Sequence, residues 1–139
     1  MSTYAAIVDG LHTALAGVSG INVVLDYAPT SVHETPLMYS ILDSVEVSKG
    51  GQVTTRRFRI LHRLLVPWQD NEQAEVQIMP FVDSIPAALD ADPQLSGTIA
   101  SGYAQITDIE ALWVTIAGVE YRALDFYSLV IDKEEVIRA

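Results

Sequence analysis

The most regular pattern of apolar and polar positions in the chain lies in the stretch 52–66. It alternates with a period of two, is rich in β-branched, aromatic and apolar residues, and lies between Lys49-Gly50-Gly51 and Pro67, as is typical of a strand. At about 3.3 Å per residue this strand would span roughly 50 Å, two to three times the length of an ordinary strand. Part of it is therefore expected to project beyond the core of its own domain.

The alternation gives this predicted strand two different faces. One face is cationic and carries Arg57, Arg59 and Arg63. The other face is apolar and carries Phe58, Ile60, Leu64 and Val66. The stretch 37–47 is nearly as long, and the glycine-containing segment 48–51 between the two is typical of a hairpin. We expect a long antiparallel ribbon whose tip, around 45–54, stands away from the domain.

The first 36 residues predict a helix, a strand and a loop. Apolar residues recur at helical spacing over 3–18, and Ser19-Gly20 is typical of a helix end. Residues 21–27 alternate as in a half-buried strand. The stretch 29–36 has a proline at each end and no apolar period, so we expect a polar loop.

A second helix is predicted to begin after Asp70, which forms a capping-box pattern with Gln73. Pro80 and Pro86 lie inside it and each lacks a backbone donor, so we expect a bend or a break near Met79-Pro80. The helix is expected to end at 90–93. Its predicted inner stripe consists of Ile78, Val82, Ile85 and Leu89.

The chain beyond Gly97 predicts three strands, over 98–106, 111–116 and 119–131. The last of these is apolar on both faces and therefore needs cover on both sides. The predicted order is α-β-β-β-α-β-β-β within one domain, 1–139. This order indicates an α+β fold in which an antiparallel or mixed sheet has both helices packed on one face and a long projecting β-hairpin.

The composition adds an apolar surplus to this picture. Half of the 139 residues are hydrophobic and the mean hydropathy is +0.25. No apolar run approaches the roughly 20 residues of a membrane-spanning helix, and the N-terminus lacks the pattern of a signal peptide, so we expect synthesis in the cytoplasm and no membrane partner. The surplus is expected to be buried against copies of the chain or against a partner.

The formal charge of −10 argues against a protein that wraps a nucleic-acid backbone, because such binding requires many Lys and Arg residues. The arginine face could offer donors to nucleic acid or form ion pairs with carboxylates of the same or neighbouring subunits, and the acidic total favours ion pairs. The residues expected at contacts with other subunits or partners are Arg57, Arg59, Arg63, Lys49, Tyr121 and Tyr127.

The sequence contains no recognisable motif for catalysis or metal binding. His12, His33 and His62 have no second ligand at metal spacing, and the acidic loop that starts at Asp90 lacks the glycine and glutamate of a calcium loop. The chain has no cysteine, and no nucleophile-elbow or phosphate-binding pattern is present. We therefore predict no catalytic, cofactor-binding or metal-binding residue, no cofactor, and a protein that is not an enzyme.

Segments along nearly the whole chain resemble a known family. They are the helix segment 11–15, the strand start 21–24, the proline-bearing loop to 36, the arginine-bearing segment 57–60, the helix 75–89 with Pro80-Phe81-Val82-Asp83, and the ending 118–126. In these segments the sequence resembles the tail-terminator and tail-completion proteins of long-tailed, siphovirus-like bacteriophages. Those proteins are small α+β subunits.

The resemblance implies a structural protein of the virion tail or neck that is assembled in the host cytoplasm. It implies a homo-hexameric ring that caps the head-proximal end of the tail tube, stops tube growth and joins the tail to the head connector. The implied partners are copies of the chain, the tail tube protein and the head-side connector or stopper protein, with DNA only passing through the channel. Two alternatives stay open. One is a head-completion, stopper or other neck connector protein of the same virion, and the other is a small-molecule-binding α+β module, which would need a closed apolar pocket.

Overall fold

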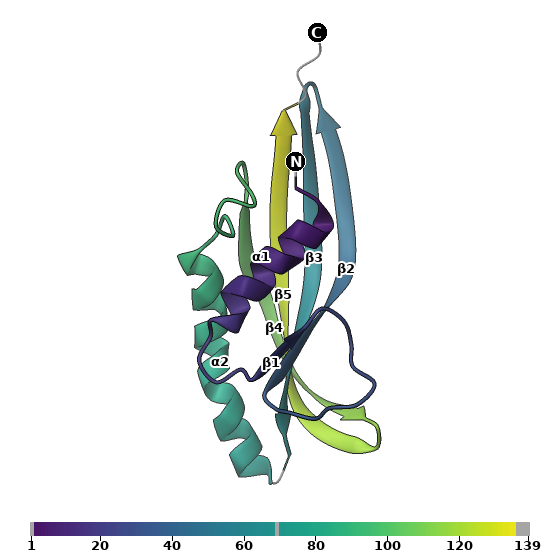
Figure 1. Cartoon of the computed structure of the whole chain (residues 1–139), viewed down its shortest axis with the longest axis vertical. Helices are drawn as coiled ribbons and strands as arrows, with labels where there is room; N and C mark the ends of the chain where they lie inside the picture. Colours follow the sequence, from purple (N-terminus) through teal and green to yellow (C-terminus); the bar gives the residue numbers. More distant parts are fainter. Residues whose placement is uncertain (1, 69, 136–139) are drawn as a thin grey trace.

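The computed structural model describes residues 2–68 and 70–135, which form two helices and a five-stranded sheet. Figure 1 shows how they are arranged. The helices are α1 (Tyr4–Ala16) and α2 (Asn71–Ala91). The strands are β1 (Val23–Leu25), β2 (Leu37–Gly50), β3 (Val53–Pro67), β4 (Tyr103–Ile116) and β5 (Val119–Glu135). Their order is β1-β2-β3-β5-β4, and only the β1–β2 pair among them is parallel. Neither helix has the length and apolar character needed to cross a membrane.

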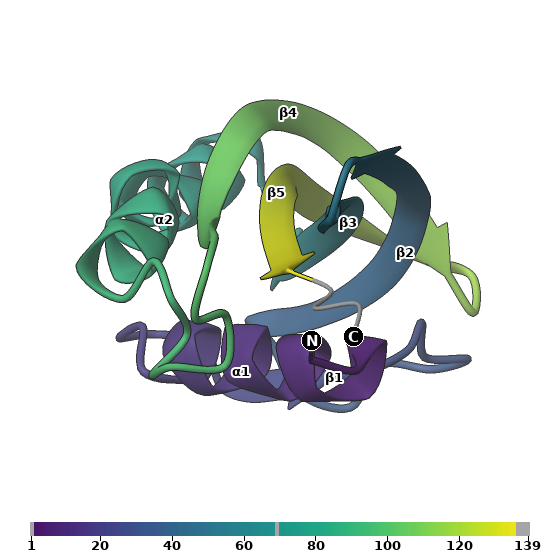
Figure 2. The same ribbon diagram turned by 90° about the horizontal axis from the view of Figure 1, so that it is seen from above.

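The main core lies between the two helices and one face of the sheet. Leu15 of α1, Ile85 of α2, Leu64 of β3 and Phe126 of β5 meet there and are buried. Seen from above, the sheet is strongly twisted and curled (Figure 2). The predicted α+β class, with both helices on one face of a mixed sheet, is confirmed.

Both predicted helix starts are capped by side chains. Thr3 Oγ1 accepts a hydrogen bond from the backbone N–H of Ala6 at 3.1 Å, and Asp70 Oδ1 accepts one from the backbone N–H of Gln73 at 2.8 Å. Each cap satisfies a backbone donor that has no partner inside its helix.

The second helix differs from the prediction in two respects. It runs unbroken through Pro80 and Pro86, so the alternative of a break is wrong. Its buried stripe contains Phe81, which is 5% exposed, whereas Val82 is 40% exposed. At about 100° per residue, Phe81 lies on the same side of the helix as its buried neighbours, and Val82 turns away from them. These neighbours are Ala74, Ile78, Ile85 and Leu89.

The predicted ribbon is formed by β2 and β3, which pair from Leu37↔Leu65 to Gly50↔Val53. It is not a free two-stranded hairpin, because β5 pairs with β3 over its whole length, from Pro67↔Tyr121 to Val53↔Glu135. β4 ends its pairing with β5 at Tyr103↔Ile131, so the projecting end of the sheet is three-stranded. β5 supplies the backbone partners that the predicted two-stranded tip would have lacked on one side.

The two strands predicted over 98–106 and 111–116 are one strand, β4. A bulge between Ile106 and Asp108 takes up Thr107, and the strand continues through residues that resemble a polar loop in the sequence. These residues, 107–110, are exposed, so their polar side chains do not have to match an apolar core. The segment 98–100 lies in turns before β4, where Ile99 fills the core instead of pairing in the sheet.

The opposite face of the sheet has a smaller core at the end where β1 lies. Leu65 and Ala123 are buried there beneath β1 and the loop 26–36, which places Val32 against them. Both faces of β5 are therefore covered within one chain over this half of the strand. The strand predicted over 21–27 is reduced to β1, because the chain turns away from the sheet after Leu25 and Tyr27 is 68% exposed.

Candidate functional site

The candidate site is the projecting ribbon, defined here as residues 41–61 of β2 and β3. β1 pairs with β2 only at residues 37–39, so in the described part of the chain residues 40–50 have no strand on their outer side. The register of this edge shifts at a bulge between Leu42 and Ser44. An unpaired strand edge presents backbone donors and acceptors to its surroundings.

One side of this edge carries an exposed apolar row. Its members are 40%, 43% and 54% exposed in the order Leu42, Val45 and Val47. Their cross-strand partners, Ile60, Phe58 and Arg56, lie on the sheet face that packs under α1. Lys49 follows on the same side at the tip. We call these four residues the β2 strip: Leu42, Val45, Val47 and Lys49.

The predicted arginine face lies on the other side of β3, and Arg63 is its most enclosed member. Its Nε donates to Asp125 Oδ1 at 2.7 Å and its Nη2 to Asp125 Oδ2 at 2.9 Å, while Nη1 donates to the hydroxyl of Tyr39 at 3.3 Å. The hydrogen bonds to Asp125 raise the pKa of Arg63 above its ordinary value. Arg63 therefore joins β3 to β5 and β2 within one subunit.

Arg59 is also engaged within the chain. Its Nε lies 3.4 Å from Asp43 Oδ2 and its Nη2 lies 3.8 Å from Asp108 Oδ2. Its guanidinium carbon stands 4.4 Å from the centre of the Tyr127 ring, which is close enough for a cation–π contact. The expected ion pairing is confirmed for Arg59 and Arg63, whereas their role in contacts between molecules stays a prediction, as does that of Tyr127.

The remaining candidates differ in what they offer to a partner. Arg57 is half-buried opposite Glu46, and Lys49 and Lys133 are exposed; none of the three cations forms an ion pair among the described residues. Tyr121 is 7% exposed and packs in the smaller core. It therefore has little surface for a contact with another subunit. Arg57 and Lys49 stay the predicted contact residues with free charge.

A line of polar contacts runs from the exposed Asp26 through α1 to the buried middle of the sheet. His12 Nδ1 lies 2.5 Å from Asp26 Oδ1, and His12 Nε2 lies 2.9 Å from Ser40 Oγ. Ser40 Oγ is 2.7 Å from His62 Nδ1, and His62 Nε2 is 2.8 Å from Ser128 Oγ. Burial, and secondly the nearby His12, lowers the pKa of His62 to about 3, so its imidazole is neutral at pH 7.

The first three groups of this line follow the order carboxylate, imidazole, hydroxyl that activates a serine nucleophile in hydrolases. Here Ser40 is 5% exposed, and a second imidazole, that of His62, engages its hydroxyl from the other side. A shallow hollow of about 240 Å³ beside α1 reaches Ser40 and Asp26. Each buried hydroxyl and ring nitrogen in these contacts has a hydrogen-bond partner. A structural polar network therefore explains the arrangement without a catalytic role.

Sequence reasoning treated His12 and His62 as isolated residues and missed this network. A signal was present, because three adjacent strands each place one polar residue on an apolar face. Ser40 follows Met38, His62 lies between Ile60 and Leu64, and Ser128 lies between Phe126 and Val130. Only the strand order shows that the three polar positions are neighbours.

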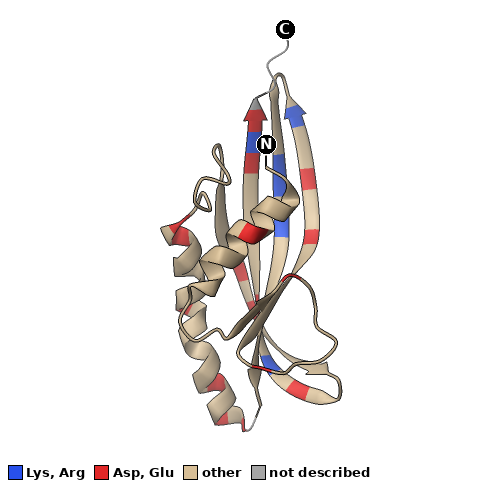
Figure 3. Ribbon diagram, viewed as in Figure 1, with Lys and Arg blue, Asp and Glu red and all other residues tan. Residues whose placement is uncertain are grey.

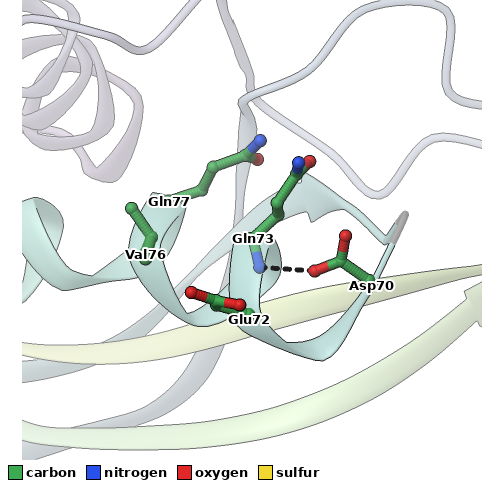
Figure 4. A pocket seen from close by; sticks show the side chains of 5 residues that line it. All are labelled: Asp70, Glu72, Gln73, Val76 and Gln77. Atoms are coloured by element: carbon green, nitrogen blue, oxygen red, sulfur yellow. Dashed lines mark hydrogen bonds between the residues drawn. The ribbon is translucent and has the colours of Figure 1, made fainter.

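The described part of the chain has several shallow surface hollows. Figure 4 shows one of about 350 Å³ at the first turn of α2, lined by Asp70, Glu72, Gln73, Val76 and Gln77. The Asp70 carboxylate in it accepts the backbone hydrogen bond of Gln73, as the capping pattern predicted. Within residues 2–68 and 70–135, no group of three or more His, Asp or Glu side chains is arranged to hold a metal ion.

The helices and the sheet differ in charge. The described helices carry acidic residues but no Lys or Arg, whereas the strands carry the described basic residues together with acidic ones (Figure 3). Four of the eight Lys and Arg residues, Lys49, Arg56, Arg57 and Arg59, belong to the ribbon. Arg56 also ties the ribbon to the start of α1, since it donates to the backbone carbonyl of Ser2 and to Asp132.

No model of a protein family matches the chain, and no curated protein sequence matches it either.

Proposed function

We propose that this protein is a structural subunit of a bacteriophage tail that closes into a homo-hexameric ring at the head-proximal end of the tail tube. In this role the ring stops tube growth and joins the tail to the head-side connector, while DNA passes through its channel. The observation that carries the proposal is the ribbon, whose unpaired edge exposes Leu42, Val45 and Val47. The resemblance of the sequence to tail terminators supplies the identity of the assembly.

The positions of the exposed apolar residues support the proposal of a ring. The two cores absorb the apolar side chains at the centre of the sheet, but large apolar residues remain exposed on the ribbon and on the outer side of α2. A head-to-tail interface joins two different surfaces, one from each neighbouring subunit. Repeating such an interface forms a closed ring when the rotation between subunits completes a circle. Such an interface would bury the exposed row on β2.

The first test measures assembly directly. Native mass spectrometry between about 1 and 50 µM should give a hexamer or a monomer–hexamer equilibrium, and projection images should show rings. A strict monomer over this range, also in the presence of tail tubes, would contradict the proposal.

The second test separates the tail-terminator role from the alternative of a head-completion or stopper protein. Loss of a terminator leaves tails of uncontrolled length. Loss of a head-completion protein leaves filled heads that do not attach to tails of normal length. Thermal stabilisation by a member of a metabolite panel would instead favour a small-molecule-binding module.

A further inference from the structure

The molecule has a second exposed apolar row, on the outer side of α2. Val76 and Met79 are 58% and 62% exposed, more than any of the apolar residues in the β2 strip. Glu72 and Asp83 are exposed as well and lie on the same side of the helix, because the four positions are spaced by four, three and four residues. We call these four residues the α2 stripe: Glu72, Val76, Met79 and Asp83.

The β2 strip and the α2 stripe are complementary in charge. The strip ends in Lys49, which has no ion pair among the described residues, and its apolar members carry no charge. The stripe has a carboxylate at each end, and α2 carries no Lys or Arg that could neutralise them on the helix itself. An apolar contact flanked by opposite charges selects its partner by its charged rim.

The α2 stripe is long enough for the outer part of the β2 strip. Residues 72–83 of a helix span about 17 Å, and residues 45–49 of an extended strand span about 13 Å. They lie on opposite flanks of the subunit, with α2 on one side and the upper part of β2 on the other in both views (Figures 1 and 2). One chain therefore cannot bring its own two surfaces together.

We infer that the β2 strip of one copy docks on the α2 stripe of the next copy, and that this contact is the repeating interface of the ring. The inference rests on the proposed ring and identifies the surfaces that close it. Val45 lies against Val76 and Val47 against Met79, and this direction brings Lys49 to Asp83 at the end of the stripe. The contact is head-to-tail, since it joins unlike surfaces.

The absence of cysteine from the sequence allows a clean cross-linking experiment. Val47→Cys and Met79→Cys are made as separate proteins, and native mass spectrometry first establishes the assembly state of each before oxidation. Mixing the two and oxidising should then give disulfide-linked dimers, because each interface brings residue 47 of one copy to residue 79 of the next. Each variant oxidised alone should give few dimers.

Val119→Cys supplies the matched control, because Val119 is 51% exposed and lies at the β4–β5 turn, outside both surfaces. A mixture of Val47→Cys with Val119→Cys should cross-link no more than either variant alone. Strong cross-linking of Val47→Cys with itself would show that β2 pairs with β2 of another copy and would overturn the inference. Rings without a 47–79 cross-link would overturn the interface and leave the ring, whereas a monomer before oxidation would overturn the ring itself.

A charge exchange tests the polar rim independently. Val47→Asp places a carboxylate beside the acidic stripe and should raise the subunit concentration for half-assembly at least about tenfold, with an unchanged circular dichroism spectrum. Lys49→Glu should weaken assembly, and combining it with Glu72→Lys and Asp83→Lys should restore at least part of the loss. If Lys49→Glu weakens assembly and the combined variant recovers none of it, Lys49 does not meet the α2 stripe.

Discussion

His62 shows how one buried side chain makes stability depend on pH. It is fully buried, and both ring nitrogens have hydroxyl partners, Ser40 on one side and Ser128 on the other. In one consistent arrangement of protons, His62 donates through one nitrogen and accepts through the other, which a neutral imidazole can do and an imidazolium cannot. Folding therefore favours the neutral ring.

The prediction concerns acid. The folded pKa of His62 is lowered to about 3 from its ordinary 6.5, so between these values the unfolded chain binds a proton that the folded chain does not. Stability should be unaffected by this group above pH 6.5 and should fall as the pH drops toward 3, by up to about 1.4 kcal/mol per pH unit.

Urea unfolding at pH 7, 6 and 5 measures this slope. His62→Gln removes the titrating group, so the free energy of unfolding should fall less steeply with decreasing pH than in the parent. The carboxylates contribute equally to the pH dependence of both proteins. His33→Gln is the matched control, because His33 is exposed in the loop 26–36. A slope that is the same for His62→Gln and the parent would contradict the assignment.

At the scale of the element, the start of β4 depends on Gly102. This glycine lies directly before the last β4–β5 pair, Tyr103↔Ile131, and close to the backbone of β5. A Cβ added at Gly102 would lie 1.8 Å from the backbone carbonyl oxygen of Ile131, far inside van der Waals contact. The backbone of β5 cannot retreat there, because β3 holds it through the pair Arg57↔Ile131 on its other side.

Gly102→Ala should therefore destabilise the protein by about 3 kcal/mol, because either β4 shifts away from β5 or both strands distort. Chemical unfolding measures the loss. Gly50→Ala is the control, since its added Cβ would meet nothing within 4 Å and its backbone angle is ordinary. Equal stability of the two variants would show that β4 can relieve the clash at little energetic cost.

The elements also show what the sequence could and could not predict. Periodicity and capping residues correctly predicted both helices, the β2–β3 ribbon and the two faces of β3, because those signals are local. The continuity of β4 through Asp108 was not predictable, since exposed polar residues in a strand look like a loop until a partner strand is known. The same holds for β5 as the third strand of the projecting end.

In the candidate site, too, local features were predictable from the sequence and long-range contacts were not. Alternation placed the arginines on one face, but it could not show that Arg63 is fixed by Asp125, which is 62 residues away in the sequence. Alternation also predicted Tyr121 to be a contact residue. The loop 26–36 helps to cover the core in which Tyr121 packs, but this loop has no periodic signal in the sequence, so its cover could not be predicted. Side chains that meet through strand order cannot be paired from spacing alone.

At the scale of the whole molecule, stability should be greatest along β3. It has a neighbour on each side over residues 53–65, β2 on one and β5 on the other, in the described part of the chain. β2 has a strand on only one side beyond Tyr39. Backbone groups that bond to water on an open edge exchange their hydrogens more readily than groups enclosed by two strands.

Native-state hydrogen exchange on the monomer can test this. Amides of 53–65 should all be protected, whereas amides of 44–50 should alternate between slow ones, directed at β3, and fast ones, directed outward. Uniformly fast exchange over 53–58 would contradict the three-stranded end of the sheet. In the ring, the outward amides of 44–50 should slow as α2 of the neighbour covers them.

The bulge at Asp43 affects the tendency of newly made chains to aggregate along β2. A long, straight, apolar edge is a template for endless strand-by-strand growth into fibres. The extra residue bends that edge and breaks its hydrogen-bond spacing, and the charges of Asp43, Glu46 and Lys49 add to the barrier. The edge of β2 is therefore a poor template for another copy of itself, and newly made chains are expected to resist fibre growth along it.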